Sequence, residues 1–523
     1  MTVKKKQKTK KKSPSVVFLL AGALFDYHMK VAQELRDRHP KCKLSAFISG
    51  RHYLVDNIKK LDDTPYAFNR YDVLNDMTTQ WLNTPVDYKR LEFYRKKLGD
   101  DILRKIITAD REIGYGYVVG GYVERTPLID YFEKNPDSRW SYVIGLLDYC
   151  FDLIKDQKPD VIYTYGVAGA DAIALHFAAH YHNIPAVQLS YARYDDYYVL
   201  DPCEKMTMPL VKKRYEDTLK NPKSIDKDAY KIASDYIDDF YNRPARPIDT
   251  DHWIRKIKKE NSVLGFAKTL TLDIARWGAL KAGLIGSRGI WRQRYGFEIL
   301  KMSALNFWHI QKFIRQKQKS LNDILGDSKF IYFPLHIDPE MTTMVMADKL
   351  TDQISVIEHL SKSMPAGWKI IVKDHIPMIG KRPSDFYKRL KNIPDVYIVS
   401  PFEDNFECMK QATLISTITG TTGLEAMLLG KTPLIIGLPH YINVGEGFVH
   451  CTEPTNFGQA IKDALKTKPI SREKLKTYMA CMLSMSFKLS TAYYWFKGTM
   501  TNDEMTNSIN GIVNAIEEHA KIR

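Results

Sequence analysis

The stretch "PDVIYTYGVAGADAIALHFAAHYHNIPAVQLS" (159–190) predicts the architecture of the first half of the chain. An apolar run leads into a turn between Gly166 and Gly169, a segment with apolar residues at helical spacing follows, and a second apolar run begins after Pro185. The order strand, helix, strand requires parallel strands and places ligands beyond their carboxyl ends. We therefore expect a doubly wound, Rossmann-like α/β domain over residues 15–245.

The first apolar run, "VVFLLAGALF" (16–25), has two interpretations. It follows a lysine-rich start (1–14) and contains the small residues "AGA", as a signal peptide would. It also fits a first buried strand ahead of the helical segment "HMKVAQELRDRHP", and we favour this because the rest of the domain is built around it. No run reaches the ~20 apolar residues that cross a bilayer, so any membrane contact should be peripheral, at the inner face. The six cysteines are far apart and form no C-x-x-C pair, which favours a reduced, cytoplasmic protein.

The length of the chain indicates a second domain, because 523 residues exceed the size that one hydrophobic core usually reaches. The α/β pattern breaks at "NRPARPIDTD" (242–251) and resumes at "KFIYFPLHID" (329–338) with short strands rich in Ile and Val. We expect a helical connector over 246–325, a second Rossmann-like domain over 326–490, and C-terminal helices over 491–523. The two domains should face each other across a cleft.

The formal charge of +16 is concentrated in two segments. The tail 1–14 holds seven lysines and is expected to be disordered. Residues 255–320 hold fifteen Lys or Arg against three acids, and residues 252–320 contain half of the eight tryptophans. A basic amphipathic segment suits an anionic membrane surface. The alternative is that its apolar stripe packs on the domains while its lysines face water. Nucleic acid is not expected as a partner.

A strand within "WKIIVKDHIPMIGKR" (368–382) ends just ahead of a turn that contains proline and glycine. Lys373 and His375 fall at the carboxyl end of that strand. At such a position a histidine can donate a hydrogen bond to a phosphate, and a lysine can add positive charge. The alternative for His375 is a structural histidine that bonds to the backbone.

In "YFPLHIDPEMTT" (332–343), His336, Asp338 and Glu340 occupy alternate positions after a strand, so they can share one side of the chain. A carboxylate there could act as a general base or balance positive charge that develops on a sugar. Asp-Pro-Glu is also a common way to begin a helix with proline near its first position. That alternative would leave both carboxylates structural.

The segment "STITGTTGLEAMLLGKTPLIIG" (416–437) is typical of a strand, a tight turn and a helix, and the backbone amides of such a turn can bind phosphate. The predicted donor-binding residues of this segment are Ser416, Thr417, Thr419, Thr421, Thr422, Gly423 and Glu425. Here Glu425 would bind the hydroxyls of a ribose, and Gly423 would let a ligand approach. The alternative is a T-x-x-E capping box, in which Glu425 bonds to the amide of Thr422.

Three stretches together resemble the capsule polysaccharide biosynthesis glycosyltransferases: "YFPLHIDPE", "KDHIPMIGKRPSDFYKRLKNIPDVYIVSP" and "TITGTTGLEAMLLGKTPLIIG". This family includes the bacterial enzymes that add 3-deoxy-manno-octulosonic acid (Kdo) from its CMP-activated form. The resemblance covers roughly residues 325–450. It implies a GT-B fold, with a nucleotide sugar held as a substrate by the C-terminal domain, an acceptor held by the N-terminal domain, and no metal or other cofactor.

The resemblance also implies roles for individual residues. His375 corresponds to the histidine of a His-Pro motif that contacts the donor phosphate, although Ile376 stands where the proline would be. The hydroxyl cluster and Glu425 match a Ser/Thr cluster and a following acid. In relatives that use CMP-Kdo, a glutamine and an acid occupy the positions of His336 and Glu340, which implies donor binding and catalysis. The histidine is a reason not to assume Kdo.

The first domain would supply the acceptor side. In "AGALFDYHMK", Asp26 and His28 follow the first strand and are candidates for a catalytic base, although an Asp there also caps helices. Glu124 in "GGYVERTP" and Arg193 in "SYARYDDYY" are further acceptor-side candidates.

Three functional hypotheses result. The first is a glycosyltransferase of capsule or surface-glycan assembly, which moves a sugar from a nucleotide donor, CMP-linked donors included, to a glycan or lipid-linked glycan. The second is a nucleotide-sugar epimerase or a polyol-phosphate transferase of the same architecture. The third is a non-catalytic binder of anionic membranes or glycans. No metal site is expected, because "DTD" (249–251) lies in the connector and follows no strand.

Overall fold

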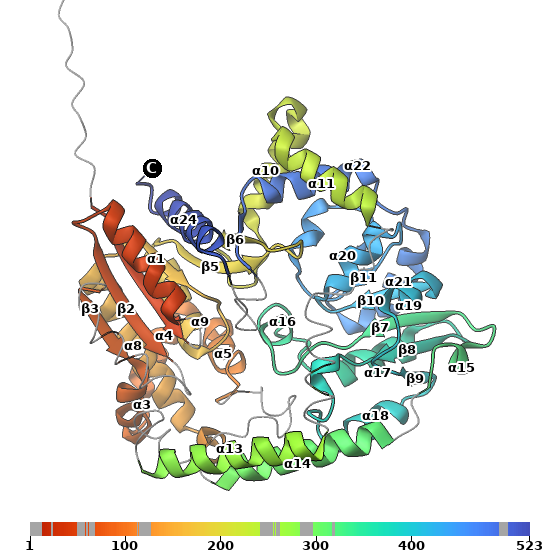
Figure 1. Ribbon diagram of the computed structural model, residues 1–523, viewed down its shortest axis with the longest axis horizontal. Coiled ribbons are helices and arrows are strands. Elements are labelled where there is room, and N and C mark those ends of the chain that lie inside the picture. The colour runs from red at the N-terminus through yellow and green to blue at the C-terminus, as the bar shows by residue number, and fades with distance from the viewer. Residues whose placement is uncertain are drawn as a thin grey trace, which may run out of the picture.

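The computed structural model describes residues 13–21, 25–49, 58, 61, 68–111, 113–114, 127–240, 255, 257, 262–282, 297–315, 319–490 and 500–522. Within them the chain forms two open sheets flanked by helices, one sheet from each half (Figure 1). The expected architecture of two doubly wound α/β domains is confirmed. Most of the lysine tail, up to residue 12, lies outside the described residues.

The first sheet has the strand order β13-β6-β5-β4-β1-β2-β3. Its strands are β1 (Ser15–Ala21), β2 (Lys43–Ser49), β3 (Arg70–Val73), β4 (Val161–Thr164), β5 (Ala186–Tyr191), β6 (Tyr197–Asp201) and β13 (Phe487–Lys488). The strands β1 to β5 run parallel, whereas β6 pairs antiparallel with β5 and β13. Val17 and Leu19 of β1 are buried in one hydrophobic core, and Phe18 and Leu20 in another. The run at 16–25 therefore begins with a central strand that is covered on both faces.

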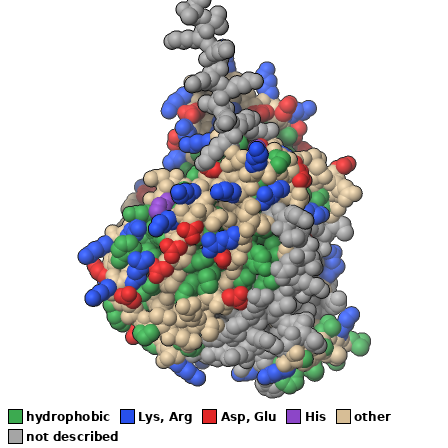
Figure 2. Space-filling view, turned by 90° about the vertical axis from the view of Figure 1, so that its left-hand side faces the viewer, with side chains coloured by type: hydrophobic (Ala, Val, Ile, Leu, Met, Phe, Trp, Pro, Cys, Tyr) green, Lys and Arg blue, Asp and Glu red, His purple; other side chains and the backbone are tan. Residues whose placement is uncertain are grey.

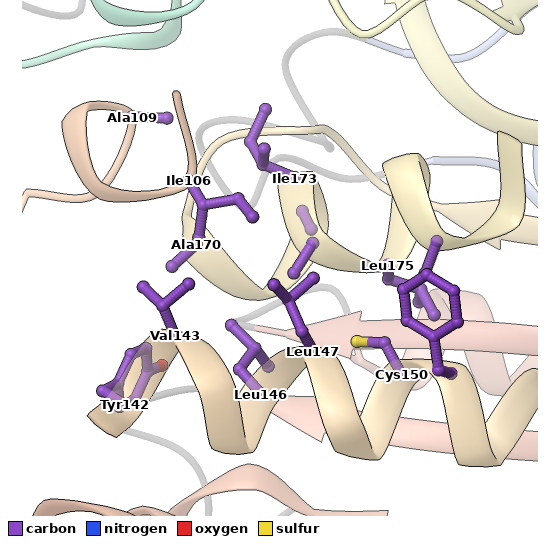
Figure 3. Close-up of a cluster of buried hydrophobic side chains, with 14 of the residues drawn as sticks. Ile106, Ala109, Tyr142, Val143, Leu146, Leu147, Cys150, Ala170, Ile173 and Leu175 are labelled. Atoms are coloured by element: carbon purple, nitrogen blue, oxygen red, sulfur yellow. The ribbon is translucent and has the colours of Figure 1, made fainter. Parts of the chain in front are cut away.

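Helices of the first half cover this sheet. They are α1 (Phe25–Arg38), α3 (Leu74–Asn83), α4 (Tyr88–Leu98), α5 (Asp100–Thr108), α7 (Pro127–Lys134), α8 (Ser138–Gln157) and α9 (Ala170–Tyr181). Figure 3 shows part of one of the two cores, to which Ile106 of α5, Leu147 of α8 and Ile173 of α9 contribute side chains. This packing places the start of α9 beside the end of α5.

The second sheet has the order β12-β11-β10-β7-β8-β9, and all of its strands are parallel. Its strands are β7 (Phe330–Pro334), β8 (Lys369–Lys373), β9 (Val396–Val399), β10 (Leu414–Thr417), β11 (Leu434–Ile435) and β12 (Val449–His450). Its helices are α15 (Asn322–Leu325), α16 (Met341–Met344), α17 (Gln353–Ser363), α18 (Phe386–Lys391), α19 (Asn405–Gln411), α20 (Thr421–Leu428) and α21 (Phe457–Lys466). Because β7, β8 and β10 are neighbours, the segments that follow them meet at one edge.

The chain crosses between the two halves more often than the predicted division implies. The helices α10 (Pro209–Lys220) and α11 (Lys227–Asp239) pack against α22 (Arg472–Leu483), and all three share a core with α20. Beyond α22, β13 joins the first sheet and α24 (Asn502–His519) packs on α1 (Figure 1). Residues 209–239 and 487–490 therefore lie with the opposite half from the one that the predicted ranges gave them.

Ion pairs also connect the two domains. Asp348, which follows α16, lies 3.1 Å from Arg104 Nη2 of α5 and 3.1 Å from Lys205 Nζ, which follows β6. Both cations come from the first half and the acid comes from the second.

The connector contains α13 (Val263–Lys281) and α14 (Phe297–Arg315), which lie side by side along the lower edge of Figure 1, beneath both sheets. Phe266 and Phe307 stack between them, with ring centroids 4.2 Å apart. No helix in the described part of the chain is long and apolar enough to cross a membrane.

Candidate functional site

The site is built on the carboxyl ends of β7, β8 and β10. These strands lie next to one another, so the segments 335–340, 374–382 and 418–420 converge at one edge of the second sheet. This edge is where an open parallel sheet binds ligands. The segments contain the predicted residues His336, Glu340 and His375.

A buried arginine fixes two of these segments to each other. Arg382 donates to Asp338 at 3.0 Å, to Asp374 at 2.8 Å, and to the backbone carbonyl of His336 at 2.6 Å. All three charged side chains are almost fully buried. Although burial opposes the charge, Asp374 and Asp338 raise the pKa of Arg382. Arg382 and Asp338 therefore position the loops; Asp338 is structural through this pair, and not because it begins a helix, since α16 starts only at Met341.

A hydrogen bond from the segment that follows β10 sets the tautomer of His336. Its Nε2 accepts the backbone N–H of Thr419 at 3.1 Å, so the proton of the neutral ring is on Nδ1. Burial, together with the neighbouring Arg193 and His375, lowers the pKa of His336 to about 3. Its Nδ1 is buried and has no hydrogen-bond partner among the described residues. His336 therefore holds an unused N–H donor at neutral pH.

The predicted hydroxyl cluster divides into structural and exposed members. Thr417 Oγ1 accepts the N–H of Gly420 at 3.1 Å, and Thr419 Oγ1 donates to the carbonyl of Thr342 at 3.0 Å. Ser416 is fully buried in β10, and Thr422 is buried in the first turn of α20. Thr421, the first residue of α20, is exposed. Of the five hydroxyls, only that of Thr421 stands where a ligand could reach it directly.

Glu425 does not form a capping box. The helix α20 begins at Thr421, its N-cap is Gly420, and no side chain caps it. Glu425 lies two residues beyond the position from which a capping-box side chain bonds back to the cap, so the capping-box interpretation is wrong. Its carboxylate instead accepts a long hydrogen bond of 3.5 Å from Asn405 Nδ2.

The surroundings of Glu425 hold a proton on it near neutral pH. Burial raises the pKa of its carboxyl group to about 7, while Arg193 and Lys373 oppose the rise. Lys373, at the end of β8, is itself partly buried, and that burial lowers the pKa of its amine. The positive charge of Lys373 acts on the Glu425 carboxylate, and this suits a carboxylate that receives hydrogen bonds from ligand hydroxyls.

Gly423 has a structural purpose that differs from the predicted one. A Cβ atom on Gly423 would lie 2.9 Å from two ring carbons of Tyr441 and closer still to its Oη. Tyr441 in turn donates to the carbonyl of Gly420 at 2.5 Å. The missing side chain admits the Tyr441 ring, so the prediction that it admits a ligand is not supported.

Gly423→Ala is expected to destabilise the protein by about 1–3 kcal/mol, because the added methyl overlaps a fully buried ring that cannot move aside. Thermal or urea unfolding measures the change. Gly458→Ala in α21 is the matched control, since a Cβ there meets only the Ser363 carbonyl at 3.8 Å. Equal effects at the two glycines would contradict the packing of Tyr441.

His375 and Glu340 follow the two carboxylates of the network closely in the sequence. His375 is exposed, and the surrounding protein, with Lys373 and Arg382, lowers the pKa of its imidazole to about 4, so it is neutral at pH 7. Glu340 is half-buried and accepts from Thr342 Oγ1 at 2.7 Å. Burial raises the pKa of Glu340, against the opposing charges of Arg111 and Arg193.

Arg193 brings the first domain into this site. It follows β5 with a left-handed backbone (φ 58°), and its guanidinium carbon lies 5.9 Å from the ring centroid of Tyr441. Its charge acts on the carboxyl groups of both Glu340 and Glu425. Sequence reasoning put Arg193 on the acceptor side, whereas the structure brings it to the predicted donor residues.

The remaining candidates of the first domain lie elsewhere or outside the described residues. His28 is fully buried in α1, 3.1 Å from the hydroxyl of Tyr163, and burial lowers its pKa to about 3. The structure therefore contradicts a base at His28 that faces the second domain; the helix already begins at Phe25 and turns this side chain into the core. Asp26 is exposed in the first turn of α1, and Glu124 lies outside the described residues.

Sequence reasoning missed two carboxylates at the start of α9. Asp110 accepts the N–H of Ala170 at 3.2 Å, and Asp171 accepts the N–H of Ala172 at 2.8 Å. A Cβ on Gly169, between them, would contact both carboxylates. Burial, with a contribution from Asp110, raises the pKa of Asp171. The only signal in the sequence was the "GAD" that follows β4.

The described residues contain no group of three or more His, Cys, Asp and Glu side chains that could hold a metal ion, and residues 249–251 lie outside them. No family model and no curated protein matches the chain.

Several solved structures resemble the chain. KpsC of Thermosulfurimonas dismutans, a beta Kdo 2,7 transferase, is 12% identical, covers 70% of this chain and 89% of its own, and has a TM-score of 0.33. The UDP-GlcNAc 2-epimerase of Neisseria meningitidis, bound to UDP-GlcNAc, is 14% identical, covers 96% and 100%, and has a TM-score of 0.27. A glycosyltransferase of Rickettsia africae is 10% identical, covers 98% and 98%, and has a TM-score of 0.25.

The first of these structures is of the class that the sequence resembles.

Proposed function

We propose that the protein is a glycosyltransferase that binds a nucleotide sugar at the carboxyl end of the second sheet. The observation that carries the proposal is His336, whose buried Nδ1–H has no partner in the described part of the chain. A buried donor without an acceptor costs free energy, which a bound acceptor recovers. A phosphate oxygen is such an acceptor, and Arg193 and His375 lie close to the same ring.

The other groups fit the parts of a nucleotide sugar. The first-turn amides of α20, together with Arg193 and Lys373, would stabilise negative charge on the leaving phosphate without a metal ion. Glu425 would accept hydrogen bonds from the ribose hydroxyls. Glu340 would then face the sugar, where a carboxylate can balance charge in the transition state.

The acceptor would bind from the first domain. In this proposal Asp171, which lies beside Asp110 at the start of α9 and whose pKa burial raises, joins Glu340 and Asp26 as a candidate for the base that removes the acceptor proton. We propose a surface or capsular glycan or glycolipid as the acceptor, used at the inner face of an anionic membrane that residues 252–320 contact. Exposed apolar and basic side chains on α13 and α14 support this contact.

A panel of CMP-, UDP-, GDP- and CDP-linked sugars tests the donor site by thermal stabilisation. A ligand at 100 times its Kd is expected to add about 2.7 kcal/mol to the free energy of unfolding. His375→Ala and Arg193→Ala should reduce that gain. Glu358→Ala, an exposed carboxylate paired with Lys362, is the control and should leave it unchanged. If no donor stabilises the protein, the proposal fails.

Product analysis separates transfer from the alternatives. A glycosyltransferase releases nucleotide only when an acceptor is present, apart from slow hydrolysis. An epimerase converts the donor without an acceptor. A polyol-phosphate transferase transfers a phosphate group together with the polyol to the acceptor. A non-catalytic relative binds without turnover.

A further inference from the structure

The helix α14 has two faces with different environments. Ile310 and Phe313 are buried on its inner face, where they form a small core with Ile257 and Ile379. On its outer face Lys301, Trp308, Lys312 and Arg315 follow one another at intervals of seven, four and three residues, so they share one side of the helix. All four outer residues are exposed.

The inner face rests on the segment that carries His375. Ile376 and Tyr387 pack against the small core, and the rings of Phe313 and Tyr387 lie 6.0 Å apart. Gly380 approaches so closely that a Cβ there would lie 2.5 Å from Ile310 Cγ1.

This contact continues to the proposed phosphate site. Tyr387 donates to Asp374 Oδ2 at 2.5 Å, and Asp374 holds Arg382 and the backbone N–H of His375. The position of α14 is therefore linked through packed side chains to the donor loop 374–382.

The exposed surface of α13 and α14 is apolar and basic. Of the fifteen large hydrophobic residues that are exposed in the described part of the chain, six lie on these two helices: Val263, Leu264, Leu272, Ile274, Trp308 and Ile314. The exposed charged side chains described on the two helices are all basic: Lys268, Lys281, Lys301, Lys312 and Arg315. The one acid whose side chain is described, Asp273, is buried and bonded to Ser303.

The placement of these residues fits a flat, negatively charged partner. The two helices lie along one edge of the molecule (Figure 1), and green and blue side chains occur together at the lower edge of the view in Figure 2. Elsewhere on that view basic and acidic side chains are mixed, as on an ordinary solvated surface. Apolar side chains among cations of one sign match the interface of an anionic lipid bilayer.

We propose that anionic lipid binds the outer face of α14 together with the exposed apolar and basic side chains of α13, and that this contact orders the donor loop 374–382 through Ile310 and Phe313. The effect on the donor loop rests on the proposed function, in which this loop binds a nucleotide sugar. Linkage requires reciprocity: if lipid raises the affinity for nucleotide sugar, nucleotide sugar raises the affinity for lipid by the same factor.

Flotation with vesicles tests the lipid contact without any donor. The protein is expected to float with vesicles of phosphatidylserine and phosphatidylcholine and to stay behind with phosphatidylcholine alone. The variant Trp308→Ser/Lys312→Glu/Arg315→Glu should lose flotation. The matched control on α21, Leu465→Ser/Lys462→Glu/Lys466→Glu, removes one exposed apolar residue and two lysines and should keep it. The proposal is overturned if the protein floats equally with anionic and with neutral vesicles, or if the outer-face variant and the α21 control variant float equally.

Hydrogen exchange tests the link to the loop, also without donor. Anionic vesicles should slow amide exchange in residues 374–382 of the wild-type protein and leave it unchanged in the outer-face variant. Phe313→Leu keeps the outer face but loosens the contact with Tyr387, so it should float while its loop no longer responds. Unchanged exchange in the wild-type loop on vesicle binding overturns the link.

Nucleotide affinity provides the last arm of the test. With a donor that stabilises the protein, anionic vesicles are expected to lower its Kd at least about fivefold in the wild type and not in Phe313→Leu. If flotation and exchange respond but no donor binds with or without vesicles, the proposed function fails while the lipid link stands. If a donor binds with the same Kd in both conditions, the link to the site fails instead.

Discussion

Arg382→Met is expected to lower the free energy of unfolding by about 3–5 kcal/mol, because it leaves Asp338 and Asp374 buried without their cation. Folded domains have a total stability of about 5–15 kcal/mol, so the loss is a large share of it. Urea unfolding monitored by circular dichroism measures the change.

Two further variants separate the ion network from a general effect of losing an arginine. Arg389→Met removes a half-exposed arginine that lies 3.6 Å from Asp352, and such a pair contributes less than about 1 kcal/mol. In the triple variant Arg382→Met/Asp338→Asn/Asp374→Asn no buried charge is left unpaired, so part of the stability should return. If Arg389→Met costs as much as Arg382→Met, the network is not what holds these loops.

The segments that carry the site were predictable from the sequence, whereas their contacts were not. Short runs rich in Ile and Val predicted β7, β8 and β10, and the residues after them had to meet because neighbouring parallel strands end at one edge. The pairing of Arg382 with Asp338 joins residues 44 positions apart, and no local pattern encodes it. In the sequence Arg382 was only one more basic residue after the strand.

The errors have the same physical origin. The T-x-x-E pattern offered a capping box as the alternative for Glu425, with Thr422 as its cap, but α20 begins two residues earlier, with Gly420 as its N-cap. Gly423 was assigned to a ligand because Tyr441, which fills the space, lies beyond the next strand. His28 faces the core because α1 begins at Phe25, and the helix face decides its burial. Each case depends on a tertiary contact that overrides a local signal.

Arg193 belongs to the first domain in sequence but contacts the second half of the chain. The predicted ranges placed it within the acceptor domain, and its left-handed backbone after β5 carries it toward Tyr441 of the second half. The crossing of α10 and α11 to pack on α22 brings the two halves together at the same place. A group at the interface can therefore belong to the site of the other domain.

Glu425→Ala is expected to weaken nucleotide-sugar binding about tenfold to hundredfold, which corresponds to the loss of a hydrogen bond to a charged group. Glu425→Gln should also make the affinity for the nucleotide sugar independent of pH between pH 6 and pH 8. In the free protein the pKa of Glu425 is about 7, and ribose hydroxyls bind best to the ionised form. The wild-type affinity should therefore fall up to about tenfold from pH 8 to pH 6. Calorimetric titration with a nucleotide sugar measures it.

The stability of the ligand-free protein should change in the opposite sense. A pKa that is raised on folding means that the folded state keeps a proton that the unfolded chain releases above its ordinary pKa of 4.5. That contribution is fully present below pH 4.5 and is lost as the pH rises through about 7. At pH 8 Glu425→Gln should therefore be more stable than the wild type, by at most about 3 kcal/mol.

Three features make this pair of measurements decisive for Glu425. His336 is buried, with a pKa lowered to about 3, and does not titrate between pH 6 and 8, and Asp338, whose pKa burial raises to about 6, is the same in the wild type and in Glu425→Gln, so their difference belongs to Glu425. The linked phosphates of a nucleotide sugar lack the second ionisation near pH 6 that a free phosphate monoester has. The exposed Glu358→Gln serves as the control and should change neither property. If Glu425→Gln is less stable at pH 8 and binds donor as the wild type does, then this carboxylate holds the helix in place and does not hold a ribose.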